Sequence, residues 1–519
     1  MFKSKRHTKA LELYSLCIIN APFPKGDDSP ELALGFANRS AVLYHLSHYL
    51  LCVQDIKLAL KNQYPEKMQY KLYDRLGRCY YFLRQKDEAI TVKEFNHCHG
   101  IYTTKDVEAG ELLFCEKPFA SKNMHNSDLT HCQNCLNRVL SPLPCDQCSG
   151  VVFCSEECKA EAMKSFHFAE CRVLETIHNI DFGLGHLALR MVLKAGLNHI
   201  LQNNKKYPES FRSDILRIGF NKDGVYDSMD YDTVYSLVKH SEKRSLGDLF
   251  KRSVVAVFMV KCLEHTLSSQ PLSTKAHLPE KCVIGGHILR HIQMLPCNAH
   301  EVSEFAYREY DLPNSQTMEI GSGIYATLSL INHSCDPNVV RHSYGDFCAV
   351  RAIRNIPKGT EVYDSYGALY PLTAKKDRQE KLLSQYFFKC SCKACLEKWP
   401  LYFQIPNEVP YFYCEKCSGY LSIPEDGKTQ RAMCDRCRYV QDMTPKLDVW
   451  TRSDEIFAKK LKEIIGGVVT SDALSVLLGH LKTLDQLIIR PFADYNDCQE
   501  AIKQCLNLQA NCKKVDLYA

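Results

Sequence analysis

The residues of this chain with the clearest chemical potential are cysteines that stand in closely spaced pairs. The sequence has 519 residues and 27 cysteines. The segment 132–171 alone supplies eight soft ligands, the number that two tetrahedral zinc ions require. Because the pairs alternate along the segment, we predict a cross-braced module that folds only with its metal. One ion would be bound by Cys132, Cys135, Cys154 and Cys158, and the other by Cys145, Cys148, His167 and Cys171.

A second group of thiols is the sequence "CSCKAC", which contains Cys390, Cys392 and Cys395. Three thiolates leave a tetrahedral zinc site one ligand short, so the fourth ligand must come from elsewhere in the chain. Cys335, in the stretch "LINHSCDPNVV", is a candidate for this position.

A third group has the pattern of a zinc ribbon or knuckle, with fortuitous free cysteines as the alternative. Its members are Cys414, Cys417, Cys434 and Cys437. The remaining cysteines are scattered, and we expect them to be buried apolar residues. His125 and His131 lie just outside the first group and are predicted to be ordinary surface histidines.

The stretch "LINHSCDPNVV" combines a short apolar run with six consecutive polar or turn-forming positions. Leu330 and Ile331 predict the end of a buried strand, and Asp-Pro-Asn predicts a turn. A plain turn does not need Asn332, His333 and Cys335 beside one another. These three residues are therefore candidates for separate chemical tasks.

The composition is that of an ordinary globular protein, with 45% hydrophobic and 24% charged residues. The length predicts three or four domains. A net charge of +5 gives no independent case for nucleic-acid binding. We expect no direct sequence-specific contact with nucleic acid. We see no membrane-spanning run and no signal peptide. These features favour a monomer in the cytoplasm and nucleus, where cysteine clusters bind metal more often than they form disulfides.

The flanks of the chain are rich in helical periodicity. Segments that begin at Asn38 and Asp74 align with a period of 36 residues, and Arg39, Ala41 and Tyr44 match Arg75, Gly77 and Tyr80. This spacing is similar to that of tetratricopeptide repeats, and two plain amphipathic helical hairpins are the alternative. Between the flanks, strand signals surround the cysteine-rich segment and return at 321–366.

The order of these features resembles the SMYD family of SET-domain protein-lysine methyltransferases, in which a MYND zinc finger interrupts the SET domain. The resemblance is carried by "NHSCDPN", "GTEVYDSYG", the Cys-x-Cys-x-x-Cys tail and the first cysteine module. Helices on both sides make the chain most similar to the fourth branch of the family, which carries tetratricopeptide repeats. The implied fold class is α+β: a SET body of small β-sheets with an inserted finger and a helical insert, flanked by all-α regions.

The resemblance implies eight segments. They are a tetratricopeptide-like region (1–93), the first part of the SET domain (94–131), the MYND finger (132–171), a helical insert (172–298), the SET core (299–367), a post-SET zinc region (368–400), a zinc-ribbon-like segment (401–450) and C-terminal tetratricopeptide-like helices (451–519).

The resemblance also assigns roles to individual residues. It implies that Tyr366 is the active-site tyrosine, that Cys335 joins the thiols of the tail on zinc, and that Tyr386 lines the substrate channel. S-adenosyl-L-methionine would be the methyl donor. Its expected contacts are His97, Cys98, His99, His240, Asn332, His333, Tyr366 and Phe388.

The sequence departs from the family at the first of these contacts. Family members usually have a glycine-rich basic stretch before the first strand, where the backbone approaches the cofactor. Here the aligned residues are "NHCHG", 96–100, in which two glycines are lost. Because the other motifs match, the resemblance still implies a protein-lysine methyltransferase. The alternative is a weakly active or inactive SET scaffold that recruits proline-containing peptides or corepressor-type proteins through its finger and helical repeats.

Overall fold

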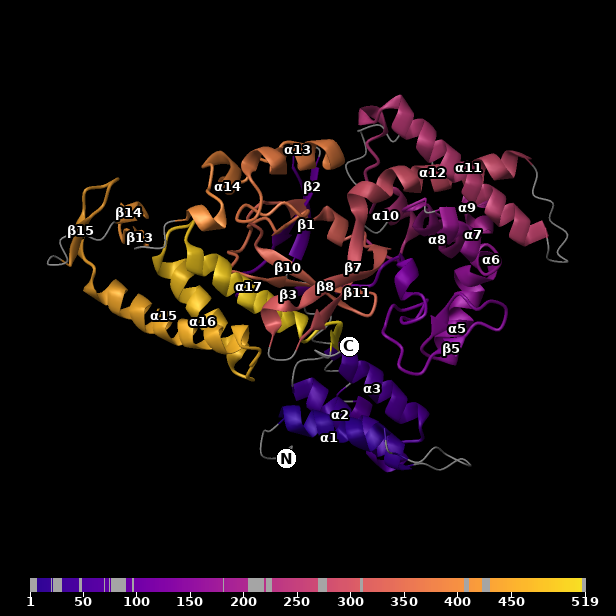
Figure 1. The fold of residues 1–519 in the computed structure, drawn as a ribbon, viewed down its shortest axis with the longest axis horizontal. Helices are drawn as coiled ribbons and strands as arrows, with labels where there is room; N and C mark the ends of the chain where they lie inside the picture. The colour runs from indigo at the N-terminus through magenta and orange to yellow at the C-terminus, as the bar shows by residue number, and fades with distance from the viewer. Residues whose placement is uncertain are drawn as a thin grey trace. The chain divides into compact units, whose positions relative to one another are not determined.

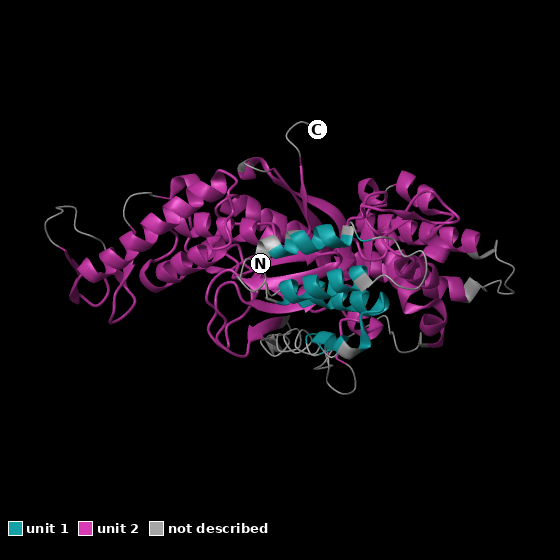
Figure 2. Ribbon diagram, turned by 90° about the horizontal axis from the view of Figure 1, so that it is seen from below, with its two compact units in different colours: residues 1–90 teal, residues 91–519 magenta. Residues whose placement is uncertain are grey.

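The computed structural model divides into two compact units, residues 1–90 and 91–519, which Figure 2 distinguishes by colour. Each unit is described by itself. The structure describes residues 7–19, 21, 30–45, 49–69, 71–73, 75, 90–95, 98–180, 182–203, 219–220, 226–268, 278–308, 311–405, 410–421 and 430–515. Within these ranges, no helix has the length and apolar character needed to cross a membrane.

Among its described residues, the first unit includes the helices α1 (His7–Ile19), α2 (Pro30–His45) and α3 (Tyr49–Lys61). Its core includes Val42 and Ile56, which are fully buried. Arg39 of α2 donates to both carboxylate oxygens of Asp55 in α3, at 2.7 and 2.8 Å. Gly77 and Tyr80 of the second expected repeat lie outside the described residues, so the tetratricopeptide assignment stays a prediction.

A helical insert occupies the first half of the second unit. Helix α8 (Gly185–Ala195) is buried from Gly185 to Leu193, and its Leu187 and Met191 share a core with the long helices that follow it. The cysteine-rich segment before the insert holds α5 (Glu156–Ala162) and α6 (Phe168–Glu170). The helices of the insert are α7 (Leu174–Ile180), α8 (Gly185–Ala195), α9 (Leu197–Asn203), α10 (Tyr231–Tyr235), α11 (Leu246–Ser268) and α12 (Leu278–Asn298).

Several small sheets form the body of the second unit, as expected for a SET domain (Figure 1). The four-stranded sheet has the order β17-β7-β8-β4, and a three-stranded sheet has the order β10-β11-β3. Two-stranded pairs are β1-β2, β5-β6 and β12-β9, and two more, β13-β14 and β15-β16, lie in the C-terminal part. The strands are β1 (Ile90–Phe95), β2 (Cys98–Thr103), β3 (Leu112–Glu116), β4 (Ala120–Asn123), β5 (Leu143–Pro144), β6 (Val152–Phe153), β7 (Ala299–Tyr307), β8 (Gln316–Ile324), β9 (Asn332–His333), β10 (Val339–Tyr344), β11 (Phe347–Ala352) and β12 (Tyr363–Asp364).

The C-terminal part of the unit is helical but also completes the central sheet. Strand β17 (Cys512–Lys514) pairs in parallel with β7, and the N–H of Phe305 donates to the carbonyl of Asn511 at 2.8 Å. The other elements are α13 (Lys375–Tyr386), α14 (Lys393–Leu396), β13 (Phe412–Tyr413), β14 (Tyr420–Leu421), β15 (Arg431–Met433), β16 (Val440–Asp442), α15 (Thr444–Ile465), α16 (Ala473–Leu487) and α17 (Ala493–Asn507).

The apolar residues before the polar stretch are not the end of a strand, so that prediction is wrong. Residues Leu328–Leu330 form a 3-10 turn, and Ile331 continues into the short strand β9. The turn forms because the buried carboxylate of Glu116 accepts the backbone N–H groups of Thr327 and Leu328 at 2.9 and 2.8 Å. Glu116 lies more than two hundred positions earlier in the chain, so periodicity near the turn gives no sign of it.

This buried carboxylate predicts a pH effect on stability. Burial raises the pKa of Glu116 to about 7 from an ordinary value of 4.5. Between these values the folded state binds more protons than the unfolded state, so this group's contribution to the free energy of unfolding falls as the pH rises. The loss amounts to at most about 3 kcal/mol.

The substitution Glu116→Gln removes this titration. We expect the stability of the wild type to fall relative to that of Glu116→Gln between pH 4.5 and 7, measured by denaturant unfolding at each pH. Glu111→Gln, at a solvent-accessible pair with Lys105, is the control and should run parallel to the wild type. A wild-type curve parallel to that of Glu116→Gln would contradict the prediction.

Candidate active site and metal clusters

Two sequence motifs meet in a short parallel pair of strands. Residue Asn332 of β9 pairs with Tyr363 of β12, and His333 pairs with Asp364. The N–H of Ser334 then donates to the carbonyl of Asp364 at 2.9 Å. This pairing brings the stretch "NHSC" beside "GTEVYDSYG", although the sequence separates them by about thirty positions.

The side chains of His333 and Tyr366 are fixed by this arrangement. The backbone N–H of Tyr366 donates to Nδ1 of His333 at 3.0 Å, and the Tyr366 hydroxyl donates to the carbonyl of Ile331 at 2.8 Å. Burial raises the pKa of Tyr366 and lowers that of His333 to about 4. At neutral pH the site therefore holds an uncharged hydroxyl and an uncharged imidazole.

Two aromatic rings lie close to the ring of Tyr366. The ring of Tyr386 lies 4.7 Å from that of Tyr366 between centroids, and Phe388 lies 6.3 Å from Tyr366 and 6.1 Å from His333. Helix α13 ends at Tyr386 because Phe387 adopts a left-handed conformation, with φ of 62°. That turn lets residues on both sides of it line the same cavity.

The cavity has a volume of about 1450 Å³ and gathers most of the predicted cofactor and channel residues. Its lining includes His240, Asn332, His333, Tyr366, Tyr386 and Phe388. His240 belongs to the helical insert, and its ring lies 5.2 Å from that of Phe387. His97 and the side chains of Cys98 and His99 lie outside the described residues.

Glu361 is a site residue that the sequence analysis missed. Its carboxylate accepts the side-chain amide of Asn332 at 2.7 Å and the hydroxyl of Tyr363 at 2.7 Å. The hydroxyl of Tyr102 in β2 donates to the same carboxylate at 3.2 Å. Glu361 stands in "GTEVYDSYG", but only the fold shows that its carboxylate orients the amide of Asn332.

Gly100 lies against this pair of side chains. A Cβ atom at Gly100 would come within 2.8 Å of a carboxylate oxygen of Glu361 and 3.2 Å of the amide nitrogen of Asn332. The glycine retained in "NHCHG" is therefore at a position where the backbone closely approaches Asn332 and Glu361.

Cys335 meets the three thiols of the tail, as predicted. Its sulfur lies 3.6 Å from that of Cys395 and 3.9 Å from that of Cys390, and Cys392 completes the group. A tetrahedral zinc ion with Zn–S bonds near 2.3 Å separates its ligands by about 3.8 Å. The side chain of Gln379 holds this cluster by donating to Cys395 Sγ at 3.3 Å and to the Cys390 carbonyl at 2.7 Å.

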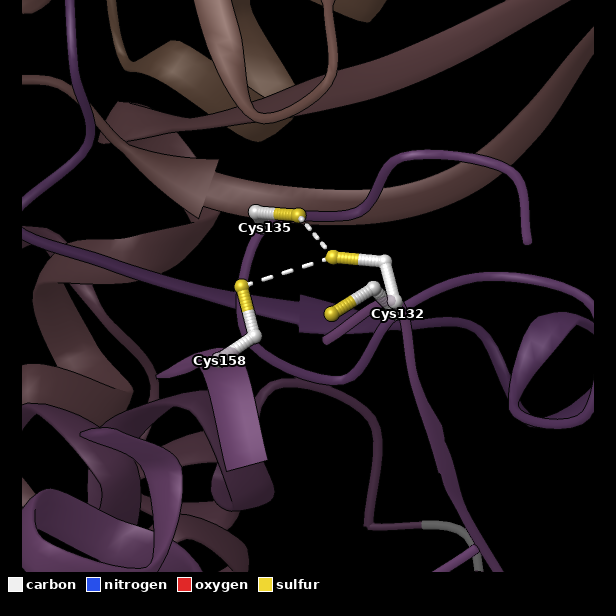
Figure 3. A group of neighbouring side chains, drawn as sticks. Cys132, Cys135 and Cys158 are labelled. Atoms are coloured by element: carbon white, nitrogen blue, oxygen red, sulfur yellow. Dashed lines mark hydrogen bonds between the residues drawn. The ribbon is translucent and has the colours of Figure 1, made fainter. Parts of the chain in front are cut away.

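The first cysteine module has the predicted cross-braced grouping. Cys132, Cys135, Cys154 and Cys158 form one group, and Cys145, Cys148, His167 and Cys171 form the other. In the first group, Cys154 Sγ lies 3.7 Å from Cys135 Sγ and 3.5 Å from Cys158 Sγ. Figure 3 shows the sulfur atoms of Cys132, Cys135 and Cys158 turned toward one another.

The third group is also assembled. Cys414 Sγ lies 3.7 Å from Cys437 Sγ, and Cys417 Sγ lies 3.5 Å from Cys434 Sγ. Each pair of ligands follows a strand of a small hairpin, β13-β14 or β15-β16. All three thiol-rich regions therefore present ligand sets that fit zinc.

Two predictions about which side chains are buried are wrong. His131 is not a surface residue: it is 1% exposed, and its Nε2 lies 3.5 Å from a carboxylate oxygen of Glu304. The buried carboxylate of Glu304, which also pairs with Arg138, gives the His131 ring a partner inside the protein. The scattered cysteines are not all buried either, since Cys17, Cys282 and Cys512 are exposed.

Comparisons with known proteins show which sequences this chain resembles. The model of the SET domain family matches residues 98–367. The chain is 28% identical to the "Protein-lysine N-methyltransferase SMYD4" of Danio rerio, over 82% of this chain and 68% of that protein. It is 26% identical to the SMYD4 protein of Homo sapiens, over 76% and 65% of the two chains.

A more distant relative is the "Histone-lysine N-methyltransferase ASHR1" of Arabidopsis thaliana, which is 23% identical over 65% of this chain and 61% of that one. The chain spans about two thirds of the length of the curated relatives it matches. The solved SET domain of LSMT, bound to lysine and AdoHcy, aligns with a TM-score of 0.26 at 9% identity, covering 83% of this chain and 89% of that one. Similarity at that level says nothing about this fold.

The four-thiol cluster gives a direct prediction. Cys335→Ser and Cys392→Ser should each lose one equivalent of zinc and lower the melting temperature to the same extent, because each removes one ligand of the same ion. Metal analysis and thermal unfolding measure both effects. Cys282→Ser, at an exposed thiol, is the control. Full zinc content in Cys335→Ser would show that Cys335 is not a ligand.

Proposed function

Because this chain belongs to the SET-domain family, and within it to the SMYD proteins with SMYD4-like features, we propose that it is an S-adenosylmethionine-dependent protein-lysine N-methyltransferase. The observation that carries the proposal is the convergence of Tyr366, His333 and two further rings on one cavity beside Asn332. The substrate is a lysine side chain of a histone or another protein.

The residues present fit the methyl donor. The cavity is larger than a drug-sized ligand needs. At its edge Gly100 has no side chain, and a Cβ there would press on the Asn332–Glu361 pair. We propose that Asn332, His333, His240 and Phe388 hold the cofactor, with the backbone near Gly100 closing one side. When bound, S-adenosylmethionine supplies a sulfonium-linked methyl group.

The chain's own residues prepare the lysine. A lysine amine has an ordinary pKa of about 10.4, and it must be neutral to act as a nucleophile. The rings of Tyr366, Tyr386 and Phe388 would surround it and remove water, which disfavours the ammonium form. The Tyr366 hydroxyl, held by the carbonyl of Ile331, would keep the amine in line with the methyl group. No carboxylate is needed as a base.

We also propose roles for the metal-ligand clusters. The spacing and cross-braced grouping of residues 132–171 support a MYND finger with two zinc ions that binds proline-containing peptides or corepressor-type proteins. One zinc ion would lie at Cys335 and one more between Cys414 and Cys437. The cysteine-rich composition supports action in the cytoplasm and nucleus, and we propose a monomer with tetratricopeptide-like flanks.

A second function is favoured by one specific observation. Two glycines of the family's cofactor-binding stretch are absent from "NHCHG", which favours a SET scaffold with weak or no cofactor binding. Cofactor affinity separates the two proposals, since the scaffold requires neither binding nor transfer.

The Tyr366→Phe variant tests the enzymatic proposal. We expect calorimetric binding of S-adenosylmethionine to stay close to that of the wild type, because the ring remains. Methyl transfer to a protein mixture should fall by about 10²-fold, because the hydroxyl that aligns the amine is lost. Tyr344→Phe, in β10, should keep full activity. Absence of cofactor heat and of transfer in the wild type would favour the scaffold instead.

Gly100→Ala tests the close backbone approach. The added methyl group should displace the Asn332 amide and weaken S-adenosylmethionine binding by about tenfold, a loss of about 1.4 kcal/mol. The melting temperature should change little, because the neighbouring atoms belong to side chains that can move. Gly286→Ala, which meets no atom within 4 Å, is the matched control. Equal cofactor affinity in Gly100→Ala and Gly286→Ala would show that Gly100 does not lie at the cofactor site.

A further inference from the structure

A group of two histidines and one aspartate lies outside the cysteine clusters. His125 and Asp128 belong to the turn just before the first cysteine module, and His178 lies in α7 just after it. One ligand atom from each residue lies within 4.8 Å of the others. We propose that these three residues form a further binding site for a divalent transition-metal ion such as zinc.

The distances fit metal coordination. Nδ1 of His125 lies 3.3 Å from Oδ2 of Asp128, and Nδ1 of His178 lies 3.6 Å from the same oxygen. A tetrahedral ion with bonds near 2.0 to 2.1 Å to nitrogen and oxygen separates its ligands by about 3.3 Å. Two imidazole nitrogens thus converge on one carboxylate oxygen, and the longer of the two distances exceeds that of a hydrogen bond.

The surroundings favour a cation at this point. The Asp128 side chain is only 3% exposed, so its charge has little access to water. The neighbouring His186 already has a partner, because its Nε2 lies 3.2 Å from a carboxylate oxygen of Glu170. Glu170 also pairs with Arg190.

The site differs in kind from the cysteine clusters. Its ligands are harder than thiolates, and three protein ligands leave the fourth position open. The His125 side chain is 76% exposed, so the open side faces solvent and the ion can exchange. An ion bound here would connect the segment before Cys132 to the helix after Cys171, and so clamp both ends of the cysteine module.

The test uses the full chain with zinc already in its cysteine clusters, and Co²⁺ as the probe. We expect one additional equivalent of Co²⁺ with visible d–d absorption but without the thiolate-to-cobalt charge-transfer band. His125→Ala should bind this equivalent at least about tenfold more weakly, since loss of even an outer partner costs a metal site 10- to 100-fold. Asn126→Ala, on the same exposed turn, should bind like the wild type.

Two further measurements keep the proposal open to refutation. His178→Ala should weaken Co²⁺ binding like His125→Ala, and if it fails to fold, the exposed His125 variant decides alone. Total zinc in the cysteine clusters should be equal in all soluble variants. The proposal would be wrong if the wild type bound no additional equivalent of Co²⁺ or if the bound Co²⁺ showed a thiolate charge-transfer band. It would also be wrong if His125→Ala bound Co²⁺ as tightly as the wild type.

Discussion

Burial of the polar stretch His333–Cys335, next to the half-buried Asn332, is the constraint on which the rest of the site depends. Polar groups removed from water must find partners inside the protein. Asn332 finds Glu361, His333 accepts the N–H of Tyr366, and Ser334 donates to Asp364. Cys335 joins the thiols of the tail. The first three partners lie within residues 361–366 and the thiols lie in the tail at 390–395, so satisfying this one stretch holds two separate segments against it and aligns the cavity's walls.

The same principle extends to the C-terminal helices. Asp336, next in the sequence, is buried and pairs with Arg354 at 3.0 Å and with Arg490 at 2.6 Å. Arg490 lies between α16 and α17, so a charge pair holds the helical region against the turn that carries the site. Removing one partner would leave the other charge buried and uncompensated, which costs far more than an exposed ion pair contributes. The C-terminal helices are thus part of the site's support.

Local patterns in the sequence predicted the metal-ligand groups well, because zinc ligands come in pairs within two to four residues. The family resemblance predicted that Cys335 belongs to the tail cluster. It also predicted the positions of Tyr366, Tyr386 and Phe388. Interactions between distant segments could not be predicted: Glu116 converts the expected strand end at Leu330 into a 3-10 turn, and Glu304 draws His131 inside. The role of Glu361 escaped notice because it depends on three strands at once.

Strand β17 has a consequence for the synthesis of the chain. The side chain of Asn511 donates to the carbonyl of Ser303 at 3.2 Å across 208 positions of sequence. At ribosomal speeds of about 5–20 residues per second, the edge of β7 therefore stays unpaired for roughly 10 to 40 s after its own synthesis. An open strand edge is a template for pairing with other chains. Nascent chains on the same messenger RNA would thus depend on chaperones during this interval. This dependence comes from the order of the strands in the sequence and not from catalysis.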